Sequence, residues 1–103
     1  MKNLKDIIQE RLHINKDTKI VYNYHPKKRL ELSQLINKLI EERGDEADLN
    51  DIDTSEITDM RQLFLNSEFN GNISEWDVSN VKNMKYMFVG TSLEKNPPKW
   101  YKE

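Results

Sequence analysis

The sequence of 103 residues contains no cysteine, which excludes disulfide bonds and thiolate metal sites. It has no apolar run near the roughly 20 residues that a membrane-spanning helix needs. The first residues also lack the apolar stretch of a secretion signal. A chain of this length holds one hydrophobic core, so we expect a single cytoplasmic domain with no membrane contact.

Catalytic patterns are also missing. With three glycines in the whole chain, no glycine-rich phosphate loop exists. The two histidines, His13 and His25, do not have metalloprotease spacing, and Ser33 lies outside any nucleophile elbow. We therefore expect a protein that is not an enzyme and that binds no cofactor or metal.

Charge is present but unevenly distributed. The net charge is −2, yet residues 41–59 hold 9 of the 18 carboxylates and a single basic side chain. Residues 1–40 instead carry an excess of lysine and arginine. Such separation predicts a local electrostatic feature between residues 41 and 59.

The first part of the chain predicts three elements. Apolar residues at helical spacing predict a short helix over residues 3–12 and a longer one over residues 28–43, followed by Gly44, which favours the end of a helix. Alternation in residues 19–24 predicts a strand that ends before Pro26. The apolar stripe of the longer helix consists of Leu32, Leu35, Ile36, Leu39 and Ile40.

The second part is an internal repeat with a constant shift of 24 residues. The segment LNDIDTSEITDMRQLFLNSEF (49–69) aligns with ISEWDVSNVKNMKYMFVGTSL (73–93). The matched pairs include Asp53 and Asp77, Ser55 and Ser79, Met60 and Met84, Phe64 and Phe88, and Trp76 and Trp100. A period in the twenties is typical of leucine-rich-type solenoids, with one strand and one short helix per coil.

We therefore predict an α/β fold: a short leucine-rich-repeat-like solenoid of about two and a half 24-residue repeats. Residues 1–47 would form an N-terminal helix–strand–helix cap, and residues 48–103 the repeats with a C-terminal cap, within one domain. Short helices over residues 58–66 and 82–90 would place Phe64 on Phe88, and Trp76 would lie on Trp100. The Asp-x-Ser pairs would bind backbone N–H groups in the turns.

The pattern D-x-S-x-[IV]-x-x-M-x-x-[LM]-F, followed by FNGNISEWDVSNV, resembles the BspA-like leucine-rich repeat proteins of bacteria. The resemblance covers residues 48–101, including NPPKWY. It implies a non-enzymatic recognition scaffold, which in that family is often on the cell surface and binds host proteins or other bacteria. The few repeats and the missing secretion signal favour instead an intracellular bacterial protein, such as one carried by a phage or mobile element.

Three interpretations of the acidic segment stay open. A calcium loop beginning at Asp48 would need glycine at its sixth position and glutamate at its twelfth, where the chain has Asp53 and Asp59. The carboxylates would otherwise be solvated turn and cap residues. The third interpretation is an exposed negative ridge that binds a basic surface, as an inhibitor of a nucleic-acid-acting enzyme or defence system would. The ridge residues are Glu41, Glu42, Asp45, Glu46, Asp48 and Asp51.

Three apolar residues are expected on the outer side of the repeats, where polar residues are usual. Leu65, Tyr86 and Val89 would project away from the core, which favours either a protein interface or packing against the C-terminal tail. We therefore predict a protein-binding module whose partner residues are these three and the acidic ridge. Its partner would be a protein, for the inhibitor hypothesis a basic nucleic-acid-binding one, and direct binding of nucleic acid is not expected.

Overall fold

The computed structural model describes residues 13–15 and 20–102, so the helix predicted for residues 3–12 lies outside the described residues. Strands β1 (His13–Asn15) and β2 (Ile20–Tyr22) form an antiparallel pair in which Ile14 lies opposite Val21. β2 confirms the core of the strand predicted over residues 19–24. β1 is absent from the predicted elements, because three residues are too short a run to show an alternating pattern.

Helix α2 (Arg29–Arg43) confirms the predicted long helix. Leu32, Ile36 and Leu39 are buried on one face, as the spacing of apolar residues requires. Gly44 ends the helix at a φ of 95°, and its N–H donates to the carbonyl oxygen of Ile40. Glycine suits this position because side chains with a Cβ rarely adopt a positive φ.

The two repeats lie side by side in the register that the sequence predicts. Isolated parallel bridges join Asp48 to Asn72 and Asp59 to Asn83, which are 24 residues apart in each case. The N–H groups of every second residue from Met60 to Asn66 in the first repeat donate to carbonyl groups of the second. These bonds run from Met60 to Asn83, Gln62 to Lys85, Phe64 to Met87 and Asn66 to Val89.

Short polar turns recur with the same period. In each, an Asp or Asn side-chain oxygen accepts the N–H of the residue two positions later, which satisfies a backbone donor without secondary structure. The turns begin at Asp48, Asp53 and Asp59 in the first repeat and at Asn72, Asp77 and Asn83 in the second. The predicted role of the Asp-x-Ser pairs is thereby confirmed.

The helices predicted over residues 58–66 and 82–90 are wrong. Residues 61–66 and 85–90 form turns, with positive φ at equivalent positions of the two repeats. Gln62 and Tyr86 have φ values of 55° and 59°, and Asn66 and Gly90 of 56° and 80°. An α-helix cannot pass through such residues, since right-handed helices require negative φ.

The core lies between α2 and the two repeats. It is rich in aromatic rings, and the predicted pairs are confirmed: Phe64 stacks on Phe88 at 5.7 Å, and Trp76 on Trp100 at 6.2 Å between ring centroids. The buried side chains of α2 belong to the same cluster as those of the repeats. Consequently the helix and the repeats share one core.

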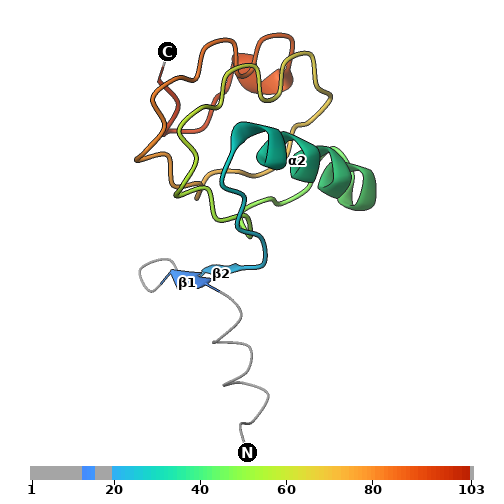
Figure 1. Ribbon diagram of the computed structural model, residues 1–103. Coiled ribbons are helices and arrows are strands. Elements are labelled where there is room, and N and C mark those ends of the chain that lie inside the picture. The colour runs from blue at the N-terminus through green and yellow to red at the C-terminus, as the bar shows by residue number, and fades with distance from the viewer. Residues whose placement is uncertain (1–12, 16–19, 103) are drawn as a thin grey trace, which may run out of the picture.

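The predicted fold class, an α/β leucine-rich-repeat-like solenoid with a helix–strand–helix cap, is wrong. Within residues 48–102 there is no α-helix or strand, only bridges, turns and the short 3₁₀ segment η1 (Ser92–Glu94). The described chain is a small globule in which irregular repeat segments pack beside α2 (Figure 1). The polar turns and the residues with positive φ change the direction of the backbone at points where the coil of a solenoid would continue as a strand or a helix.

Candidate protein-binding surface

The outer side of the second repeat is incompletely covered. In the first repeat Thr54, Ile57 and Met60 are buried, because the second repeat lies over them. The equivalent residues of the second repeat, Val78, Val81 and Met84, are only half-buried. We refer to the side of the second repeat formed by Val78, Val81 and Met84 as the open face.

The C-terminal tail covers the neighbouring part of the second repeat. The indole of Trp100 stacks on Trp76 and donates to the carbonyl oxygen of Ile73 at 2.8 Å. Tyr101 packs edge-on against Phe88, with 4.9 Å between ring centroids. The tail therefore buries the aromatic half of this side and leaves the open face uncovered.

A groove of about 690 Å³ lies over the open face. The three half-buried apolar residues of the open face line it, and so does Trp100. Three lysines line it, Lys82, Lys85 and Lys102, and no carboxylate of residues 13–15 and 20–102 does. Apolar contact and positive charge are thus available together.

A second groove of about 400 Å³ adjoins the first, because Asn83 and Lys85 line both. It adds Arg29 and Arg61 to the basic lining, together with Tyr86. The Nε of Arg29 donates to the carbonyl oxygen of Arg61 at 2.7 Å, which ties the start of α2 to the first repeat. The basic surface consequently extends over both repeats.

The carboxylate of Asp59 lies near this basic surface. It forms an ion pair with Arg61, with 3.0 Å between Oδ2 of Asp59 and Nη2 of Arg61. The hydrogen bond from Arg61 holds the pKa of Asp59 below its usual value, against the opposing effect of partial burial, and Arg29 contributes by its charge. Because both groups are largely solvated, the pair adds little to stability.

The predicted apolar residues lie on the turns beside these grooves. Tyr86 is 57% exposed, and Leu65 and Val89 are 39% and 37% exposed. Leu65 and Val89 occupy equivalent positions of the two repeats. The carbonyl oxygen of Val89 accepts the N–H of Asn66, the residue after Leu65. Tyr86 also lines the second groove. The structure thus groups these three residues on neighbouring turns, and their role in binding stays a prediction.

Most of the predicted acidic ridge is exposed. Glu41, Glu42, Asp45 and Glu46 are exposed and form no ion pair with described residues. Asp48 is exposed too, but its Oδ1 accepts the backbone and side-chain N–H groups of Asn50. The ridge lies at the end of α2 and in the loop that follows it.

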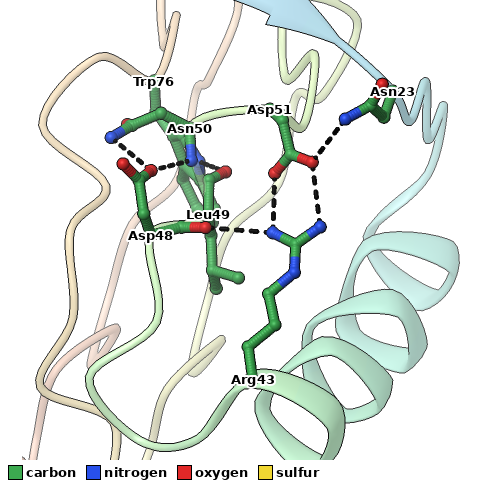
Figure 2. Close-up of polar contacts among 7 residues, drawn as sticks. All are labelled: Asn23, Arg43, Asp48, Leu49, Asn50, Asp51 and Trp76. Atoms are coloured by element: carbon green, nitrogen blue, oxygen red, sulfur yellow. Dashed lines mark hydrogen bonds and ion pairs between the residues drawn. The ribbon is translucent and has the colours of Figure 1, made fainter.

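Asp51 differs from the other ridge residues because its carboxylate accepts hydrogen bonds from two other segments of the chain (Figure 2). Its two carboxylate oxygens accept hydrogen bonds from Arg43 at 2.9 and 3.0 Å, and one also accepts from Asn23 at 2.9 Å. Arg43 additionally donates to the carbonyl oxygen of Asp48. This network joins the segment after β2, the end of α2 and the first repeat.

The network makes stability depend on pH. Burial raises the pKa of the Asp51 carboxyl, but hydrogen bonds from Arg43 and Asn23 outweigh it, and the pKa lies below the ordinary value. The ionised form is therefore favoured by folding, and the stabilisation is lost as pH falls through the folded pKa, below about 4. We expect Asp51→Asn to lower the melting temperature at pH 7 and to differ little from wild type near pH 2.

A matched control separates this network from general acid sensitivity. Asp59→Asn makes the same chemical change in an exposed ion pair, where asparagine can keep the turn bond to the N–H of Arg61. We expect a change within about 0.5 kcal/mol for this variant at pH 7. Thermal unfolding of both variants across the acid range checks this. An equal loss from the two substitutions would contradict the role assigned to Asp51.

In the part of the chain that the structure describes, no group of three histidine, aspartate or glutamate side chains is arranged to hold a metal ion. None of the described helices has the length and apolar character needed to cross a bilayer.

Comparison with protein families matches residues 31–102 to the family described as Mycoplasma protein of unknown function, DUF285. The chain belongs to this family. The DUF285 match begins within α2 and contains both repeats, the open face and the tail residues that border it. Searches of curated proteins and of solved structures found no match to the chain.

Proposed function

We propose that this DUF285 chain is a non-enzymatic protein-binding module, and that its partner binds at the open face. The observation that carries the proposal is the contrast between Ile57 and Met60, which are fully buried, and their half-buried equivalents Val81 and Met84. Covering each half-buried side chain would contribute on the order of 1 kcal/mol. The exposed residues Leu65, Tyr86 and Val89 extend the apolar area on the adjoining turns.

The proposal includes a relation to the BspA-like repeat proteins, which act by recognition. The repeated D-x-S-x-[IV]-x-x-M motif supports it, as does membership of the DUF285 family. The side-by-side packing of the two repeats gives the motif a physical role. Its Asp and Ser residues form the turns, and in the first repeat its Ile57 and Met60 are part of the core.

Binding of a basic partner by the acidic ridge, as an inhibitor, is a second candidate. Its support is the exposure of Glu41, Glu42, Asp45 and Glu46 without ion pairs among the described residues. Asp51 adds no net negative charge to this surface, because its ion pair with Arg43 neutralises its carboxylate. Binding at the ridge would weaken strongly with added salt, as exposed charges are screened.

A comparative capture experiment tests the first candidate. Wild type, Val81→Arg and the double variant Glu42→Lys/Glu46→Lys serve as baits in lysate of the native host, after circular dichroism shows that each is folded. We expect a protein that wild type and the double variant retain and Val81→Arg loses. Calorimetry with that protein, purified, should show the affinity falling about ten-fold or more for Val81→Arg, since a charge would be buried.

The same baits discriminate the two candidates. Loss of a purified, directly binding partner only with Glu42→Lys/Glu46→Lys would contradict binding at the open face and support the inhibitor hypothesis. A partner that binds all three baits equally would contradict both. The substitutions lie on separate parts of the fold, at the open face and at the end of α2 and its loop.

A further inference from the structure

We infer that the open face accepts a turned, acidic segment of the partner protein, which would bind the second repeat as the second repeat binds the first. This inference deepens the proposed function and rests on it. It specifies the backbone path and the charge of the partner segment. Both follow from the register between the repeats.

Backbone donors define the path. The N–H groups of Met60 and Gln62 donate to the carbonyl oxygens of Asn83 and Lys85, at 2.9 and 3.0 Å. Their equivalents, Met84 and Tyr86, line the two grooves and have no hydrogen-bond acceptor among the described residues. Edge donors of this kind are a template for pairing with another chain. An occupant with carbonyl groups at the same spacing would satisfy both.

The occupant is expected to turn rather than to run as an extended strand. In the second repeat, Lys85 supplies an acceptor carbonyl, and the next residue, Tyr86, has a φ of 59°. Gln62, the equivalent residue of the first repeat, has a φ of 55°, so the same turn occurs in both repeats. The partner segment should therefore turn at the residue directly after the carbonyl that pairs with Tyr86.

Charge selects an acidic segment. Lys82, Lys85 and Lys102 line the larger groove and form no ion pair with described residues. Arg29 adds positive charge to the smaller groove, while the nearby Asp59 is neutralised by Arg61. A second copy offering its own first repeat would bring Arg29 against these lysines, while its Arg61 and Asp59 neutralise each other, and the contact would be repulsive. A foreign acidic segment fits better.

A pair of synthetic peptides tests the inference on the full chain. The parent peptide has the sequence of residues 73–91, ISEWDVSNVKNMKYMFVGT, and the acidic peptide carries glutamate in place of both lysines, ISEWDVSNVENMEYMFVGT. We expect the acidic peptide to bind about ten-fold more tightly in anisotropy titrations, with the difference shrinking at high salt. Amide exchange by NMR should show protection of Met84 and Tyr86 on binding.

Charge reversal on the protein provides the matched control. Lys82→Glu/Lys85→Glu should weaken binding of the acidic peptide and reverse the preference in favour of the parent. Lys95→Glu/Lys99→Glu changes two exposed lysines that line neither groove, and should leave the preference unchanged. Reversal by the first variant alone would locate the acidic segment at the open face.

Two results would overturn the inference without deciding the proposed function. Equal affinity for both peptides would contradict the inference that the partner segment is acidic. Absence of binding, or binding that leaves the Met84 and Tyr86 amides unprotected, would contradict the inferred backbone path. The capture experiment with Val81→Arg would still show whether a protein binds the open face by another geometry.

Discussion

Phe64→Ala should destabilise the protein by about 3–5 kcal/mol, a large fraction of the stability of a domain of this size. Phe64 is 1% exposed and lies at the centre of the aromatic cluster. Its ring centroid is 5.0 Å from that of Phe69, 5.9 Å from Trp76 and 5.7 Å from Phe88. Truncation would leave a cavity between the two repeats, which fixed backbone bonds on both sides prevent from closing.

Urea unfolding measures this loss, with the slope checked for a change in the denatured state. Leu65→Ala is the matched control, because Leu65 is the next residue, is 39% exposed and lies outside the core cluster. We expect its effect to stay within about 1 kcal/mol. A loss of similar size for both variants would show that the aromatic cluster does not dominate the stability of the repeats.

Gly71→Ala should cost about 3 kcal/mol for a different reason, a steric clash. An added Cβ would lie 2.0 Å from the carbonyl oxygen of Ala47 and 2.6 Å from Cε1 of Phe69. The backbone cannot move aside easily, since the flanking N–H groups of Asn70 and Asn72 donate to carbonyl groups of Asp45 and Ala47. The glycine thus permits the close contact between the second repeat and the loop after α2.

Two controls define the cause. Asn70→Ala alters an exposed neighbouring side chain and should be nearly neutral. Gly44→Ala places a Cβ where no atom lies within 4 Å, so its cost comes from the positive φ alone, on the order of 1 kcal/mol. Denaturation midpoints that rank Gly71→Ala no lower than Asn70→Ala would contradict the steric explanation.

Several features were predictable because their causes are local in the chain. The stripe from Leu32 to Ile40 predicts α2, and Gly44 predicts its end. The shift of 24 residues predicts which rings meet, since equivalent residues of adjacent repeats must lie near one another. Asp and Asn residues at turn positions predict the bonds that their side chains make.

Other features depend on contacts between distant segments. The helical spacing of Met60, Leu63 and Phe64 is real, but a turn with positive φ at Gln62 buries them equally well. The bonds from that turn to the second repeat decide in its favour. The exposed lysines also carried no signal for a groove, because their grouping arises only when the repeats and tail are packed.

The sequence by itself determined the repeat, its register, the long helix α2 and the residues of the aromatic core. These depend on side-chain type and spacing along the chain. Only the tertiary structure decided that the repeats are built from turns without a strand or α-helix, that Asp51 pairs with Arg43, and that one side of the second repeat is left open. The reason is that hydrogen bonds between segments distant in the chain fix the backbone, and local propensity is too weak to oppose them.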